Sequence, residues 1–267
     1  MCTVRAGSYK NRACRPTAIA TIYALAIFLF LAGCSGTAQR AASSTLFPDN
    51  KAGSPNLSAG QNPSDQFRLG LQYYRGEGVP RDARRAALIF RQAAEQGHSA
   101  AQYDLALLYL NGDGVAADHA EALRWFRQAA EQDNVKAQLN LGLMYAKGDG
   151  VARDLRETLR WFRAAASQGS ARAMIYLGEM SFRGEGVASD RGEAARWFRK
   201  AADQGSAEAE LYLGVMYLRG QGVAKDERQA AAWLGKAAGK GLPQAKVYLQ
   251  EIHAKKPRAV NTTSRPR

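Results

Sequence analysis

Acidic side chains recur at positions that could supply pairs of carboxylates for acid–base catalysis. They lie between two glycines and are spaced by 36 residues: Glu77, Asp113, Asp149 and Glu185. A unit built from a pair of helices separates equivalent residues by on the order of 10 Å. Most glycosidases need their two carboxylates closer together than that. We therefore expect these acids to be solvated loop residues rather than a catalytic pair.

Residue types that bind metals or act as nucleophiles are sparse in the chain. Of the three histidines, His98 and His119 are expected at helix starts, and His253 is close to the chain end. No Cys/His cluster has the spacing of metal ligands, and no nucleophile elbow, phosphate-binding loop or zinc-protease motif occurs. The sequence therefore predicts no catalytic residue, no metal and no cofactor, and it indicates that the protein is not an enzyme.

Cys34 ends an N-terminal segment that has three parts. A basic stretch up to Arg15 precedes an apolar run over 17–31 and the sequence Leu-Ala-Gly-Cys over 31–34. This is the layout of a secretory signal, and its end resembles the bacterial lipobox, in which the thiol accepts a diacylglyceryl group. Residues 1–33 are therefore predicted to be a lipoprotein signal peptide, with Cys34 as the lipid attachment site. The alternative is an uncleaved membrane helix, although the run extended through Gly33 has only about 17 residues, the lower limit for spanning a bilayer.

The residues after Cys34 predict a tethered protein of the cell envelope. Residues 34–63 are rich in Ser, Gly, Ala, Asn and Pro without an apolar period, which is typical of a flexible tether. Resemblance to Gram-negative lipoproteins implies that Ser35 after the cysteine directs sorting to the outer membrane. The expected location is the inner leaflet of the outer membrane, facing the periplasm. Because Cys2 and Cys14 leave with the signal, no thiol remains for a disulfide or a metal site.

The positive charge of the chain is concentrated at its ends. The net charge is +13 over the whole sequence, but residues 64–254 carry 26 basic and 23 acidic side chains. Residues 255–267 form a basic tail that is predicted to be disordered. A nucleic-acid-binding fold would concentrate its basic side chains on the folded part, so we expect no nucleic-acid partner.

The region 64–254 contains one pattern that recurs five times without an insertion. The sequence Gly-x-Gly-Val begins every 36 residues, at Gly76, Gly112, Gly148, Gly184 and Gly220. Such a fixed period indicates stacked helical repeats. Each unit reads as a first helix, a glycine loop and a second helix, with a Leu-Gly pair on the first helix where a neighbouring helix comes close.

The ends of the predicted helices carry recognisable signals. The loop glycines allow the positive φ that terminates the first helix. An aspartate follows the loop in every unit and is expected to cap the second helix, and in the last four units Glu or Gln stands three residues later as in a capping box. These caps are Asp82, Asp118, Asp154, Asp190 and Asp226. Glycines stop the second helices, except that Asp133 takes this place once.

These motifs together resemble the Sel-one-like repeat, a relative of the tetratricopeptide repeat with a longer loop. The resemblance rests on Leu-Gly-x-x-Tyr-x-x-Gly-x-Gly-Val-x-x-Asp, followed by Trp-Phe and Ala-Ala-x-Gln-Gly. It implies an all-α, right-handed superhelical solenoid of five 36-residue helix pairs, which holds protein or peptide partners. A C-terminal capping helix is expected over about 242–254, with Val247, Leu249 and Ile252 on its core face. Ser181 departs from the pattern, because the other units have Tyr there.

The resemblance to tetratricopeptide arrays implies a partner-binding row on the concave face, along the first helices. The candidates in the central units are Tyr103, Leu107, Leu139, Leu143, Ile175 and Glu179. The alternative interpretation places most of these residues in the core between repeats. A second row, just before the loop glycines, includes Lys147, Arg183 and Arg219 and could rim a site for an acidic peptide. Cations in the last turn of a helix also offset its dipole, and that alternative stays open.

A third basic row consists of Arg91, Arg127, Arg163 and Arg199, and three of them are expected to form ordinary pairs with acids four residues later on the same helix: Glu95, Glu131 and Asp203. The leading functional hypothesis is a lipid-anchored envelope scaffold that binds a protein or peptide, close to peptidoglycan. The alternative is an enzyme or binding protein for cell-wall peptides or β-lactam-like molecules. Some cysteine-rich members of the resembled family have been linked to β-lactams, but this chain lacks their cysteines.

Overall fold

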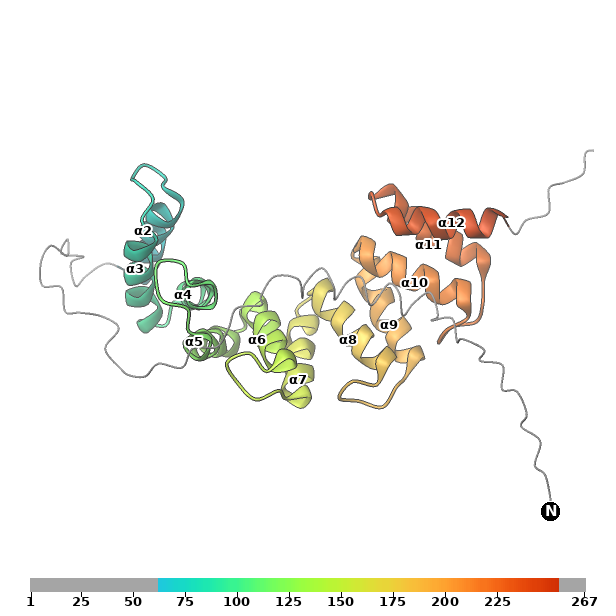
Figure 1. Ribbon diagram of the computed structural model, residues 1–267, viewed down its shortest axis with the longest axis horizontal. Coiled ribbons are helices and arrows are strands. Elements are labelled where there is room, and N and C mark those ends of the chain that lie inside the picture. Colours follow the sequence, from blue (N-terminus) through green and yellow to red (C-terminus); the bar gives the residue numbers. More distant parts are fainter. Residues whose placement is uncertain (1–61, 255–267) are drawn as a thin grey trace, which may run out of the picture. The chain divides into compact units, whose positions relative to one another are not determined.

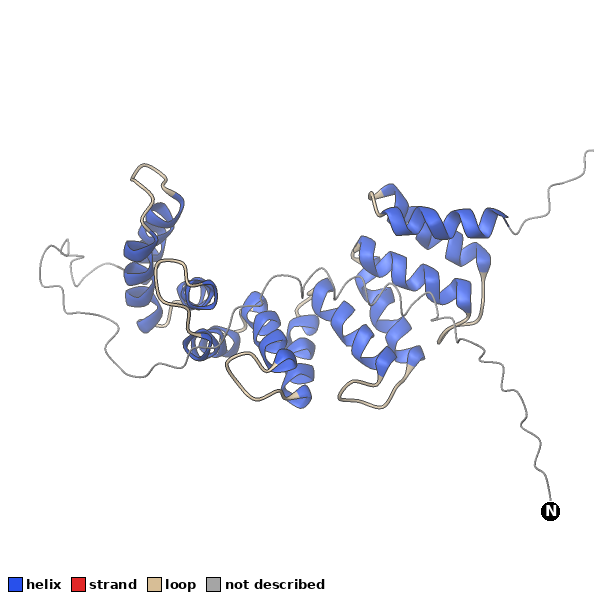
Figure 2. Cartoon of the chain, viewed as in Figure 1, coloured by secondary structure: helices blue, strands red, loops and turns tan. Residues whose placement is uncertain are grey.

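The computed structural model describes residues 62–254, and within this range every regular element is a helix (Figure 1, Figure 2). The predicted signal peptide, the lipid attachment at Cys34, most of the tether and the basic tail lie outside the described residues. None of the described helices is long and apolar enough to cross a bilayer.

Eleven helices of 12 or 13 residues follow one another along this region. They are α2 (Pro63–Arg75), α3 (Ala83–Glu95), α4 (Ser99–Asn111), α5 (His119–Glu131), α6 (Val135–Lys147), α7 (Leu155–Ser167), α8 (Ala171–Arg183), α9 (Arg191–Asp203), α10 (Ala207–Arg219), α11 (Glu227–Gly239) and α12 (Pro243–Ala254). Each helix packs against its neighbours in the chain. The predicted solenoid of five helix pairs with a final capping helix is confirmed, and the first helix begins at Pro63.

The predicted helix ends are also present. Gly112 ends α4 in the left-handed conformation, and the equivalent glycine ends each of the other first helices. Asp133, with φ of 60°, replaces the glycine that follows the other second helices, as expected. The side chain of Asp118 accepts hydrogen bonds from the first backbone N–H groups of α5, and each of the other second helices has an aspartate in this role.

Only half of the expected capping box forms. The backbone N–H of Asp154 donates to the carbonyl of Tyr145 on the preceding helix, so it does not need the carboxylate of Glu157. That carboxylate instead accepts from Trp161 Nε1 at 3.0 Å. Glu193 accepts from Trp197 Nε1 in the same way, at 3.2 Å. In these two units the glutamate therefore holds the tryptophan of its own helix, whereas Glu121 of the second unit accepts from Arg124 instead.

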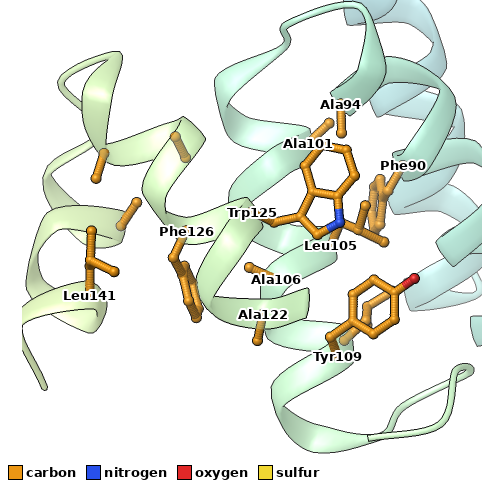
Figure 3. Close-up of a cluster of buried hydrophobic side chains, with 14 of the residues drawn as sticks. Phe90, Ala94, Ala101, Leu105, Ala106, Tyr109, Ala122, Trp125, Phe126 and Leu141 are labelled. Atoms are coloured by element: carbon orange, nitrogen blue, oxygen red, sulfur yellow. The ribbon is translucent and has the colours of Figure 1, made fainter. Parts of the chain in front are cut away.

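The core is built from small residues that let aromatic rings approach the neighbouring helix. A methyl group on Gly70 would lie 2.5 Å from the ring of Phe90, and Gly142 stands in the same relation to Phe162. Figure 3 shows this packing in the second unit, where side chains from α3, α4 and α5 form one buried cluster. It includes Phe90, Ala94, Ala101, Leu105, Ala106, Tyr109, Ala122, Trp125 and Phe126. Close helix packing therefore requires a small residue here: glycine in four units, as predicted, and Ala106 in the unit of Figure 3.

The second loop glycine makes contact between neighbouring units. A methyl group on Gly114 would clash with the carbonyl oxygen of Ala83, which is the first residue of the preceding unit's second helix. Gly150 and Gly222 meet the backbone of His119 and Arg191 in the same way. The loop therefore needs glycine both for its positive φ and for this approach.

The prediction for the face of α12 was wrong at one residue. Ile252 is buried as expected, but Val247 is 63% exposed. Val247 is equivalent to Phe67 of the first unit, whose ring lies 5.6 Å from that of Phe90 on the partner helix of its pair. Since α12 has no described helix after it, Val247 has no such partner within residues 62–254.

Candidate functional site

The loop acids do not form a row of free carboxylates. Asp113 accepts from Arg81 Nη2 of the preceding unit at 3.1 Å and bonds the hydroxyl of Tyr74. Asp149 likewise pairs with the ring of His119 on the preceding unit. These two acids remain partly exposed in their loops, and they also tie successive units together.

The third basic row also joins successive units, contrary to the expected pairs along one helix. Arg91, Arg127 and Arg199 donate hydrogen bonds to the hydroxyls of Tyr109, Tyr145 and Tyr217, which belong to the following first helix. The residue 18 positions after Arg163 is Ser181, which lacks the phenol ring that carries the hydroxyl in the other units. The spacing of 18 residues between each Arg and Tyr contained this signal.

Sequence reasoning missed a row of buried amides. Gln102 accepts from Gln132 at 2.7 Å and donates to the carbonyl of Ala94 in the preceding unit at 3.1 Å. Gln138 repeats both contacts, with Gln168 and with Ala130. A glutamine that recurs every 36 residues on an otherwise apolar helix was the signal available. The bonds between glutamines join the two helices of one pair, and the bonds to the carbonyls fix how one pair is placed on the next.

The candidate partner row is exposed unevenly along the array. Tyr103 and Leu107 on α4, and Leu139 and Leu143 on α6, are half-buried. Ile175 on α8 is only 5% exposed. The equivalent residues of α10, Leu211 and Val215, are 4% and 1% exposed. Accessible apolar surface on this row therefore lies in the first three units.

The polar groups on the first-helix face also differ between the first three units and the last two. In the last units, Tyr212 donates to Glu179 Oε1 at 2.9 Å. Burial raises the pKa of Glu179, and the bond from Tyr212 opposes this shift. In the second unit, burial raises the pKa of Asp104 to about 6. The charges of Lys136 and Arg75 oppose that rise only partly.

The basic row before the loops is largely engaged within the protein. Arg183 lies 3.4 Å from Glu185 of its own loop. Arg219 bonds Glu251 on α12 at 2.8 Å. Lys147 is exposed at the end of α6. Each of these cations also stands in the last turn of its helix, as the dipole interpretation requires.

Among residues 62–254, no group of three or more His, Cys, Asp or Glu side chains is arranged so that it could hold a metal ion. The expected absence of a metal site remains a prediction for the chain.

The chain was compared with protein families, curated proteins and solved structures, and it matches one family along the described region. The family model described as Sel1 repeat matches residues 63–98, 99–134, 135–170, 171–206 and 207–242. A comparison with curated proteins found no match.

Two solved structures are similar over most of the described region. The structure of c5321, described as a protective antigen of uropathogenic Escherichia coli strains displaying an SLR fold, is 38% identical with a TM-score of 0.70. The match covers 71% of this chain and 41% of c5321, so this chain spans about two fifths of that protein. A Sel1 repeat protein from Oxalobacter formigenes is 34% identical, with a TM-score of 0.66, and the match covers 72% of this chain and 76% of that one.

Proposed function

The chain belongs to the Sel1 repeat family, and we propose that it is a scaffold of the cell envelope, anchored by lipid, that binds a protein or peptide segment. Sel1 solenoids typically serve protein–protein interaction. The finer parts of the proposal are the binding face, the anchor at Cys34 and a location facing the periplasm near peptidoglycan.

One observation carries the choice of binding face. The half-buried side chains Tyr103, Leu107, Leu139 and Leu143 lie on two successive first helices, α4 and α6. Half-buried apolar and aromatic side chains can still lose water-accessible area to a partner, whereas buried ones cannot. We therefore assign binding to units one to three, and leave Ile175 to the packing of the solenoid.

Capture experiments with matched variants test this face. Full-length protein is used to capture partners from solubilised envelopes, beside Leu107→Asp with Leu143→Asp and beside Leu88→Asp. Leu88 is 49% exposed on α3 and is absent from the candidate row, so it controls for adding a charge to an exposed apolar site. We expect proteins that the double variant loses and the control retains.

Two results of that experiment would contradict the assignment. Capture of the same proteins by all three forms would mean that the first-helix face is not used. Turnover of a cell-wall fragment or a β-lactam by the purified protein would favour the alternative of an enzyme acting on such molecules.

The lipid anchor has a separate test. Cys34→Ser removes the thiol that would carry the diacylglyceryl group, so the variant should lose acylation and leave the membrane fraction. One lipid-modified residue with several chains gives stable anchoring, whereas an unmodified tether gives none. Membrane fractionation with mass spectrometry of the N-terminal peptide measures both effects. Unchanged retention of Cys34→Ser would show that another segment holds the protein on the membrane.

A further inference from the structure

The contacts between successive units are repeated so regularly that their interruption at one place is informative. Three kinds of tie recur between a second helix and the unit that follows it: an Arg to Tyr hydroxyl bond, a buried amide to a backbone carbonyl, and a loop glycine against the backbone. Between units one and two, and between units two and three, all three are present. All three change at the junction of α7 with α8.

The two hydrogen-bonded ties are lost at that junction because of two substitutions. Ser181 replaces the tyrosine, so Arg163 has no hydroxyl equivalent to those bonded by Arg91 and Arg127. Met174 replaces the glutamine, so no side-chain amide reaches the carbonyl of Ala166. Hydrogen bonds of this kind fix distance and direction, and their loss removes the restraint on rotation.

The loop tie is weaker there as well. The Cβ that a substitution would add at Gly186 meets the side chain of Leu155 first, and the Leu155 carbonyl oxygen is 3.4 Å away. At the other three junctions the equivalent glycine lies directly against backbone atoms. Glu185, the loop acid of this unit, pairs with Arg183 of its own unit instead of reaching back as Asp113 does.

Apolar contacts take the place of the lost ties. The rings of Phe162 and Tyr176 are stacked across the junction, 5.1 Å apart and within 14° of parallel. Leu159 on α7 is buried, and its side chain lies next to Gly186 of the following unit's loop. Stacked rings and aliphatic contacts are attractive but tolerate sliding, since dispersion depends little on direction.

The next junction, between α9 and α10, keeps directional ties. Arg199 bonds Tyr217, and Gly222 lies against the backbone of Arg191. Lys240 replaces the amide contact there, because it bonds the Gly205 carbonyl at 2.8 Å and Glu210 at 2.7 Å.

We infer that the α7–α8 junction is a hinge, at which units one to three and units four to five with α12 move as two blocks. Hinge motions concentrate in the few contacts that can rearrange without breaking the packed elements on either side. In a repeat array each unit contacts only its neighbours, so one permissive junction is enough to reorient everything beyond it. The hinge does not depend on the proposed partner face, but it would let the two blocks close on a bound segment.

Distance distributions between paired spin labels test the hinge on the full chain, with Cys2, Cys14 and Cys34 changed to Ser. The label sites are the exposed last residues of successive second helices, so each pair spans one junction in the same register. The pairs are Glu95→Cys with Glu131→Cys, Glu131→Cys with Ser167→Cys, and Ser167→Cys with Asp203→Cys. We expect the third pair to give a broader distribution than the first two. Equal widths for all three pairs would overturn the hinge.

Variants at two junctions then test whether the missing hydrogen bonds cause the hinge. Ser181→Tyr with Met174→Gln restores both missing bonds and should narrow the third distribution to the width of the others. Tyr145→Phe with Gln138→Met removes both bonds between α5 and α6 while keeping side-chain volume, and it should broaden the second distribution. If the restored variant misfolds by circular dichroism, the second variant decides alone. If the folded variants leave the widths of the distance distributions unchanged, the missing hydrogen bonds are not the cause of the hinge.

Discussion

Leu139 and Leu211 are the same residue at the same position of two units, yet Leu139 is half-buried and Leu211 is 4% exposed. The residue that follows each of them differs. Asn140 follows Leu139, whereas Tyr212 follows Leu211 and packs its ring 4.8 Å from that of Phe198 in the preceding unit. The comparison teaches that a repeat position has no fixed burial of its own, because its neighbours across the junction decide how much surface remains.

The largest expected effect uses these two leucines. Leu211→Ala removes a fully packed side chain and should lower the free energy of unfolding by about 2 to 5 kcal/mol. Leu139→Ala should cost roughly half as much, since part of its surface already faces solvent. Denaturant titration of both variants measures the difference. Equal losses of unfolding free energy would show that the first-helix face is packed alike around Leu139 and around Leu211.

The next largest effect concerns the charge of Asp104, which lies in the second unit, where the first-helix face is more exposed. Burial raises the folded-state pKa of Asp104 to about 6, so ionisation above that pH disfavours the folded state. Asp104→Asn should therefore stabilise the protein at pH 7.5, by about 1 to 2 kcal/mol after allowing for solvent screening. The gain should shrink as the pH falls through 6 and vanish below about 4, where the carboxyl is neutral in both states.

Unfolding curves at several pH values check that prediction. Asp113→Asn is the matched control, because it also removes one carboxylate but loses the pair with Arg81. It should give no stabilisation at pH 7.5. A gain for Asp104→Asn that persists unchanged at pH 3.5 would mean that the charge of Asp104 is not its cause.

The smallest expected effect is a difference in stability between two variants, one at the α5–α6 junction and one at the α7–α8 junction. Arg127→Gln removes the bond to Tyr145 and should cost about 1 kcal/mol. Arg163→Gln, one unit later, should cost close to nothing, since Ser181 offers no equivalent partner. Thermal or denaturant unfolding of the two variants measures the contrast. An equal loss of stability in both variants would show that Arg163 stabilises the fold through a contact other than the equivalent of the Arg127–Tyr145 bond.

Local signals determined most of the fold in advance. A fixed period, glycines that need positive φ and aspartates that cap helices each act through the backbone within a few residues, so they can be read without tertiary contacts. This is why the sequence alone predicts Asp133 as a left-handed substitute for glycine, which its φ of 60° confirms. The same locality explains why the Leu-Gly pair predicted close helix packing at Gly142.

The sequence by itself therefore determined the repeat, the helix ends and the family, whereas only the tertiary structure decided what the side chains between units do. Arg127 has Glu131 four residues later, but its bond goes to Tyr145, because packing brings the next helix within reach. The exposure of Leu139 and the burial of Leu211 were undecidable from one unit for the same reason. Such contacts depend on the distance between helices, and that distance is set by the combined volume of all the side chains packed between them.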